Sequence, residues 1–161
     1  EATVRAPASP QAWYGLGSAH RFGGGFTESV AALETAVTLD PEYLSAWMEL
    51  GIARAEVGDF DAARDAWTEA LRIRPSYCKA HNNLGSLAYR RGLWDEARRE
   101  LQSTLAYCPT DPIAHYMLGE IYFGPRRDPA KALLHYERVV AFEPQFEHIG
   151  RVKERILALT R

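Results

Sequence analysis

The chain has little cysteine, no long apolar run and almost no net charge. Only two of its 161 residues are cysteine, too few for a disulfide framework. No run of about 18 consecutive apolar residues occurs, so we expect no direct insertion into a membrane. The net charge is −2, and the basic residues are interspersed with acidic ones. Nucleic-acid binding needs a basic surface, so a nucleic-acid partner is not expected.

Residue combinations typical of catalysis are also missing. We find no Ser/His/Asp or Cys/His arrangement, no carboxylate pair and no phosphate-binding glycine loop in a credible context. No strand pattern precedes Gly23, Gly24 and Gly25, which favours a simple loop there. His81 and His115 could approach each other, but without a nearby carboxylate or cysteine set they are a weak metal signal. We therefore expect no enzymatic activity, no metal site and no other cofactor.

What the sequence does contain is a pattern that recurs every 34 residues. The pair Leu-Gly begins at Leu16, Leu50, Leu84 and Leu118. Prolines follow the same interval at Pro41, Pro75 and Pro109, and Pro144 comes after 35 residues. The additional residue falls in the segment FGPRRDP, where a loop could absorb it. A fixed period of this length is the signature of a repeat architecture.

Within each period the apolar spacing is that of two helices. In the second period one apolar stripe runs from Trp47 to Ala53, and another runs from Phe60 to Leu71. Gly58 lies between them, where a helix ends and the chain reverses. Pro75 closes the second stripe, because proline cannot extend a helix. Each unit is therefore predicted to be a pair of antiparallel helices joined by a tight turn.

The glycine of each Leu-Gly pair lies in the middle of a predicted helix, where it costs about 1 kcal/mol relative to alanine. That cost is tolerable if the missing side chain lets the second helix approach closely. Small residues are expected opposite these glycines, at Ser29, Ala63, Ala97 and Ala132. Large side chains are expected to fill the remaining space, namely Leu33, Trp67, Leu101 and Tyr136.

These residues resemble the tetratricopeptide repeat (TPR) family, whose pattern runs W-x2-L-G-x2-Y, then A-x3-F, then P. Trp47-Leu50-Gly51 matches the opening, and Ala63-Trp67-Pro75 matches the close. The departures are at His20, Arg54, His81, Ala88 and His115. The resemblance covers residues 10–144 and implies an all-α fold, a right-handed superhelical α-solenoid. Its four TPR helix-turn-helix units are 10–43, 44–77, 78–111 and 112–144.

The two ends of the predicted array differ. Residues 145–161 carry an apolar stripe at helical spacing, which predicts a ninth, C-terminal capping helix on the fourth unit. Residues 1–9 read EATVRAPAS and begin with Glu rather than Met, so we interpret them as a linker or a remnant of upstream sequence. No capping helix precedes the first unit. Either its outer face is exposed, or missing upstream sequence or another subunit covers it.

The resemblance also implies a site, because the first helix of each unit lines a concave groove in this family. The groove positions here carry aromatic, methionine and isoleucine side chains, which suit an extended peptide or an amphipathic helix. Their charges would set the register of a partner more than its affinity. The predicted groove set is Tyr14, Ser18, Arg21, Met48, Glu49, Ile52, Lys79, Asn82, Asn83, Ser86, Tyr89, Arg90, Ile113, Tyr116, Met117 and Glu120.

Asparagine in such a groove can pair with both the N–H and the C=O of a bound backbone. Asn83 could provide one anchor of this kind, but its equivalents Gly15, Glu49 and Met117 form no asparagine ladder. Chaperone-binding members of the family clamp a C-terminal carboxylate with a Lys/Asn/Arg set, of which only Lys79 is present here. The alternative is that the groove side chains fill the superhelix interior and bind nothing.

The sequence thus favours a non-catalytic interaction module or adaptor that binds a peptide or helix of a partner protein. A homo-oligomeric scaffold assembled through the uncapped first repeat is one alternative. A recognition module of a larger enzyme or of a secretion or assembly machine is another. The excess of Arg over Lys suggests a bacterial protein. Cys78 and Cys108 could pair at one end of a unit; the compartment stays unknown, with the cytoplasm favoured over the periplasm.

Overall fold

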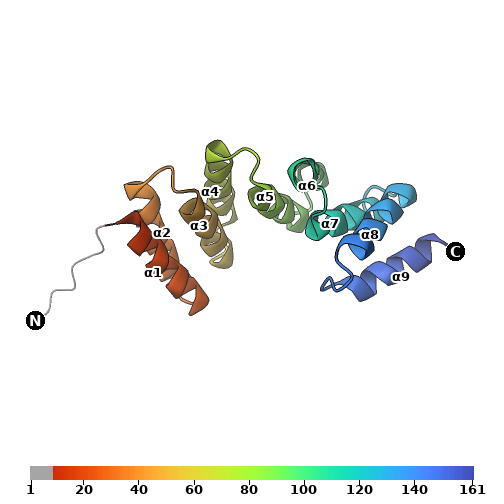
Figure 1. The fold of residues 1–161 in the computed structure, drawn as a ribbon, viewed down its shortest axis with the longest axis horizontal. Coiled ribbons are helices and arrows are strands. Elements are labelled where there is room, and N and C mark those ends of the chain that lie inside the picture. Colours follow the sequence, from red (N-terminus) through yellow and green to blue (C-terminus); the bar gives the residue numbers. More distant parts are fainter. Residues whose placement is uncertain (1–8) are drawn as a thin grey trace, which may run out of the picture. The chain divides into compact units, whose positions relative to one another are not determined.

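The computed structural model describes residues 9–161, which form nine α-helices and no β-strand (Figure 1). The helices are α1 (Pro10–Phe22), α2 (Phe26–Leu39), α3 (Leu44–Glu56), α4 (Phe60–Ile73), α5 (Cys78–Arg90), α6 (Trp94–Tyr107), α7 (Pro112–Phe123), α8 (Pro129–Phe142) and α9 (Ile149–Leu159). The all-α class is confirmed. None of these helices is both long and apolar enough to cross a membrane. Of the predicted linker 1–9, only Ser9 lies within the described residues.

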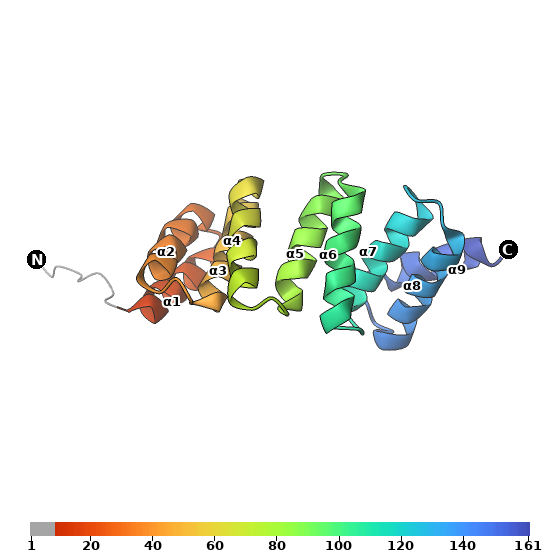
Figure 2. The ribbon, with the colours of Figure 1, turned by 90° about the horizontal axis from the view of Figure 1, so that it is seen from above.

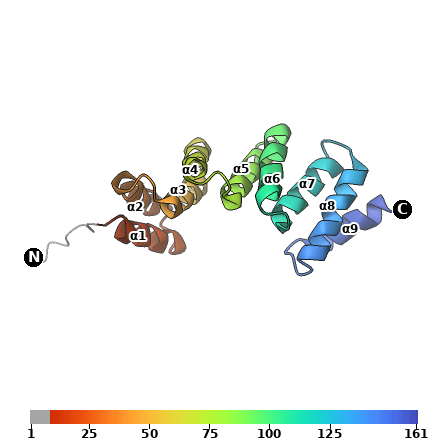
Figure 3. The same ribbon diagram turned by 45° about the horizontal axis from the view of Figure 1, so that its top comes forward.

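The helices belong to two compact units, which we describe separately: α1 to α4, up to Pro75, and α5 to α9, from Ser76. In both units consecutive helices pack as hairpins: α1 with α2, α3 with α4, α5 with α6 and α7 with α8 (Figure 2). Within each unit the next first helix, or α9, packs on the preceding second helix (Figure 3). The first helices begin where the predicted units do. The handedness of a superhelix depends on both units together and stays a prediction.

Local sequence accounts for where the helices end. Gly58 and Gly92 have φ angles of 85° and 73°, in the left-handed region that glycine adopts without steric cost. The Asp111 carboxylate accepts a hydrogen bond from the N–H of Ala114 at 2.8 Å and so caps α7. Pro112 follows in the first turn, where a backbone N–H would have no helical partner. The predicted turns and the predicted helix start are confirmed.

The helix-interior glycines mark the closest approach of the paired helices. A Cβ at Gly17 would lie 2.6 Å from Cγ of Leu33, and one at Gly119 would lie 2.6 Å from Cε1 of Tyr136. Both large side chains are fully buried. Trp67 and Leu101 take the same place in the other two hairpins. The packing role predicted for these glycines is confirmed.

Two substitutions in α1 test this close approach. We expect Gly17→Ala to lower the free energy of unfolding by about 1–2 kcal/mol, because the new methyl group would overlap Leu33. A methyl group at Gly15, in the same helix, would meet no atom within 4 Å. Gly15→Ala should therefore raise the free energy of unfolding by about 0.5–1 kcal/mol through helix propensity alone. Urea denaturation followed by circular dichroism measures both, and a stabilising Gly17→Ala would contradict the packing.

Each unit has its own apolar core. In the first unit Leu33, Leu50 and Ala66 are buried together from α2, α3 and α4. In the second unit the core includes Tyr136 of α8 and Val152 of α9, both fully buried. Helix α9 is therefore an integral part of the second unit, and its position determines which part of α7 remains accessible.

Candidate binding surface on the first helices

The predicted groove residues all lie on α1, α3, α5 and α7, the first helices of the hairpins. Their accessibility differs widely. Met48, Asn82, Met117 and Glu120 are buried. The remainder are half-buried, apart from three exposed side chains, Lys79, Arg90 and Ile113. The predicted groove residues therefore differ in their exposure to solvent. The contacts that they make also differ between the two units.

In the first unit an ion pair between two predicted groove residues joins α1 to α3. Nε of Arg21 donates to Oε2 of Glu49 at 2.6 Å, and both side chains are 20% exposed. Glu49 thus has a partner within its own unit. Ile52 and Glu56 follow it on the same face of α3, because residues three and four apart share a helix face. Ile52 is half-buried and Glu56 is exposed.

In the second unit the corresponding face of α7 carries a buried carboxylate that binds α9. Glu120 is only 7% exposed. Its Oε2 accepts a hydrogen bond from Arg151 at 2.7 Å, and its Oε1 accepts one from Nε of Arg155 at 3.4 Å. The hydroxyl of Tyr136 donates to the same Oε1 at 2.6 Å. Charge-assisted hydrogen bonds of this kind compensate for the desolvation of a buried charge.

Aromatic side chains of α7 also contact α9 and the segment that precedes it. The ring centroid of Tyr116 lies 5.4 Å from that of Phe146, in the segment that leads into α9. The guanidinium of Arg155 lies 4.0 Å from the ring centroid of Phe123. Burial raises the pKa of Tyr116, and the negative charge of Glu120 raises it further. Tyr116, Phe123 and Glu120 are therefore engaged within the chain, a contact that was not predicted.

The two asparagines of α5 are in different surroundings. Asn82 is buried, and its Oδ1 accepts no hydrogen bond from the described residues. A buried amide oxygen without a donor costs about 1–3 kcal/mol. Asn83, the predicted backbone anchor, is half-buried. Nearby, Ser86 Oγ lies 3.4 Å from Met117 Sδ, which joins α5 to α7.

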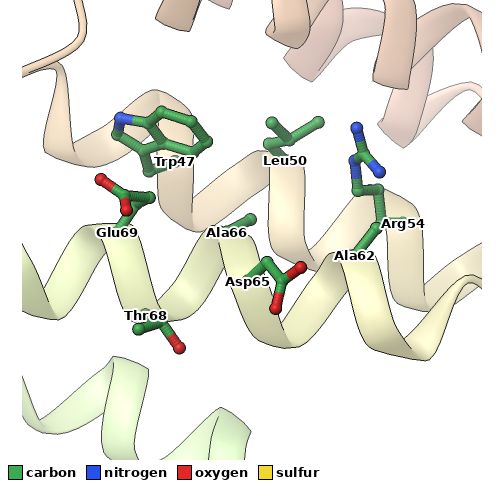
Figure 4. A pocket seen from close by; sticks show the side chains of 8 residues that line it. All are labelled: Trp47, Leu50, Arg54, Ala62, Asp65, Ala66, Thr68 and Glu69. Carbon is green, nitrogen blue, oxygen red and sulfur yellow. The ribbon is translucent and has the colours of Figure 1, made fainter.

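A cavity of about 460 Å³ lies on a side of α3 other than the one that carries Glu49 and Ile52 (Figure 4). The groove pattern does not predict this cavity; the small residues Ala62 and Ala66 of α4 are the signal in the sequence. Arg54 of this cavity pairs with Glu34 of α2. The lining side chains come from α3 and α4: Trp47, Leu50, Arg54, Ala62, Asp65, Ala66, Thr68 and Glu69.

Cys78 and Cys108 form a disulfide, a pairing that the sequence left open. Cys78 begins α5 and Cys108 caps the end of α6, so the bond closes the third hairpin at one end. Their sequence separation is 30 residues. A cross-link over a loop of this length restricts the unfolded chain and thereby stabilises the folded hairpin.

The histidines contact their own hairpins. Nδ1 of His81 lies 2.7 Å from Oε2 of Glu100, so the expectation that no carboxylate lies near it was wrong. The reason is antiparallel packing, which brings α6 beside α5. Nδ1 of His115 lies 3.0 Å from Nδ1 of His135 in α8. Within residues 9–161 no group of three or more His, Cys, Asp or Glu side chains could hold a metal ion.

The pair His115–His135 is expected to make the folded protein less stable in acid. Burial lowers the pKa of His135 from 6.5 to about 4, and the neighbouring His115 and Arg138 contribute further. As the pH falls, the unfolded chain is protonated before the folded protein. The contribution of His135 to the free energy of unfolding is therefore fully present above pH 6.5 and is lost as the pH falls to about 4.

We expect this histidine to contribute on the order of 1–2 kcal/mol to that loss, after allowing for its partial exposure. In His135→Phe the free energy of unfolding, measured by urea titration, should fall less over the same pH window. His20→Phe, outside this cluster, serves as the control. Identical pH profiles for His135→Phe and the unchanged chain would disprove a role for the pair.

The tetratricopeptide repeat family model matches residues 14–77, 48–112 and 82–145, which together cover most of the chain. The chain belongs to the tetratricopeptide repeat family. The overlapping matches extend over four TPR hairpins, α1–α2 to α7–α8. Among curated proteins, no sequence is similar enough to count as a relative of this TPR protein.

Solved structures with the TPR fold are similar to this chain. A MamA protein superposes with a TM-score of 0.82 at 21% identity, over 93% of this chain and 80% of that one. A thermophilic TPR protein from Thermus thermophilus gives 0.73 at 23% identity, over 96% and 82% of the two chains. The APC/C hetero-tetramer Cut9-Hcn1 gives 0.80 at 22% identity, with 98% of this chain matching 31% of that one. Identities this low establish the shared TPR fold alone.

Proposed function

We propose that this TPR protein is a non-catalytic adaptor that captures a short peptide or a helix of another protein on its first helices. The TPR fold is generally a protein–protein interaction module, and TPR proteins are generally non-catalytic. Recognition of an extended or helical segment by a helical surface is a common mode of protein binding.

The observation that carries the proposal is the face of α1 and α3 in the first unit. We call this the α1–α3 face and define it by Tyr14, Ser45, Ile52 and Glu56. Tyr14 and Ile52 are half-buried, whereas Ser45 and Glu56 are exposed. On α7 the corresponding face contacts α9, because Glu120 accepts hydrogen bonds from Arg151 and Arg155. A surface that combines an aromatic ring, an aliphatic side chain and a carboxylate can bury part of a partner and also orient it.

Site-specific photo-cross-linking tests this proposal. A photoreactive amino acid at Ser45, on the α1–α3 face, should form adducts with another polypeptide in the native extract. The same amino acid at Thr27, exposed on the second helix α2, should form few. Circular dichroism verifies that both variants remain helical. Equal adduct yields at the two positions, or none at Ser45, would disprove binding through the first helices.

A second candidate is a homo-oligomeric scaffold, which one observation favours. Leu16 is 39% exposed, whereas its equivalents Leu50 and Leu118 are 2% and 1% exposed. The preceding hairpin covers each of those two equivalents, so a second copy could cover Leu16. Light scattering over a range of protein concentrations measures the association, with Leu16→Glu as the comparison. A mass that stays monomeric at every concentration rules out this candidate.

A further inference from the structure

Helix α9 packs on α8, as a next first helix would, and its basic side chains reach the face of α7. Arg151 and Arg155 lie one turn apart, and both donate to the buried carboxylate of Glu120 on α7. Val152 and Ile156 of the same helix pack into the apolar core. The helix whose side chains engage this face of α7 is therefore amphipathic, with basic residues at positions i and i+4 beside an aliphatic stripe.

The α1–α3 face offers similar chemistry in the first unit. Glu56 places an exposed carboxylate on the same side of α3 as Ile52, and Glu49, one turn earlier, is paired with Arg21 of α1. Tyr14 adds an aromatic ring from α1, half-buried against Tyr43 at a centroid distance of 5.2 Å. An aliphatic and aromatic surface beside the exposed carboxylate of Glu56 matches the apolar and basic sides of such a helix.

The charge of the first unit also favours a basic occupant. Residues 1–75 contain six Lys and Arg against eleven Asp and Glu, a net charge of −5. Residues 76–161 contain thirteen against ten, a net charge of +3. The total of −2 conceals this division. An acidic surface attracts cationic segments and rejects acidic ones, which makes the sign of the charge a determinant of partner choice.

We propose that the α1–α3 face binds a basic amphipathic helix of a partner protein. A basic side chain of that helix pairs with the exposed carboxylate of Glu56, while Glu49 keeps its own partner, Arg21. Its aliphatic side chains pack on Tyr14 and Ile52. This inference rests on the proposed function and adds the chemical class of the partner.

A peptide of residues 145–161, QFEHIGRVKERILALTR, is a defined probe because it carries the required pattern. Its binding to the full chain is measured by fluorescence anisotropy. We expect Glu56→Lys, at an exposed position, to weaken binding about tenfold through charge reversal. Increasing salt should weaken binding as well, because the pairing lies near the surface. A peptide in which Arg151 and Arg155 are replaced by glutamate should not bind.

Two variants of the chain locate the bound peptide. Asp65→Lys makes the same change in charge within the first unit, but on α4 at the cavity of Figure 4. We expect Asp65→Lys to leave the affinity within about twofold of the unchanged chain, since salt screens a charge that lies away from the bound peptide. Glu120→Gln tests exchange with α9 in the second unit and should also leave the affinity unchanged.

Each result decides for or against the proposal. Weakened binding confined to Glu56→Lys supports it. A loss confined to Asp65→Lys assigns the peptide to the cavity, and a change confined to Glu120→Gln assigns it to exchange with α9; either overturns the proposal, as does the absence of binding. If the peptide fails to bind while cross-linking from Ser45 persists, the adaptor function stands and only the basic-helix class is lost.

Discussion

Replacing Glu120 by alanine is expected to lower the free energy of unfolding of the second unit by about 3 kcal/mol. The substitution removes the acceptor of Arg151 and Arg155 and leaves the buried Tyr136 hydroxyl without its partner. Helix α9 should then separate more readily from α7. Urea denaturation measures the stability, and hydrogen exchange of the amides in α9 measures the opening of that helix.

A matched pair of variants separates the contact from the loss of one charge. Glu137→Ala removes an exposed carboxylate from α8 and should change the stability by less than about 0.5 kcal/mol. Glu120→Gln keeps an acceptor for Tyr136 and should have an intermediate effect. If Glu120→Ala were as stable as Glu137→Ala, the buried carboxylate would not be what holds α9 in place.

Loss of the Cys78–Cys108 disulfide is expected to destabilise the second unit by roughly 3–4 kcal/mol. The bond closes a loop with a sequence separation of 30 residues, so its removal restores conformational freedom to the unfolded chain. The double variant Cys78→Ser/Cys108→Ser should unfold at lower urea concentration than the oxidised chain. Far-ultraviolet circular dichroism follows the transition.

Adding a thiol reductant provides the control for that experiment. The reductant should shift the unfolding midpoint of the unchanged chain toward that of the double variant, and it should leave the double variant itself unchanged. Mass spectrometry of alkylated protein reports how much disulfide is present. An oxidised chain no more stable than the double variant would show that the bond does not stabilise this hairpin.

The repeat and its helix boundaries could be predicted from the sequence because they depend on local chemistry. Gly58 supplies a left-handed backbone, and Asp111 caps the helix that follows it. The close contact of Gly17 with Leu33 could also be predicted, because the 34-residue period places small and large residues in facing positions. Such features need no knowledge of distant segments.

The contact of α9 with Glu120 could not be predicted in the same way. The apolar stripe of residues 145–161 predicts a capping helix, but the rotation of that helix about its axis depends on tertiary packing. Two signals were present: Glu120 is the only acidic residue in PIAHYMLGEIYF, and Arg151 and Arg155 lie four residues apart. The disulfide could be predicted only as a possibility for a similar reason, since the distance between Cys78 and Cys108 depends on how α5 and α6 pack.

The position of α9 also limits how the array can lengthen by duplication. Glu120 on α7 and Arg151 on α9 meet only because one helix, α8, separates them in the chain. A duplicated hairpin inserted after Phe142 would separate α9 from Glu120. The buried carboxylate would then lack its arginine partners. A hairpin copied in before Pro10 would leave that contact untouched, so gene duplications should be tolerated at the first hairpin and selected against at the last.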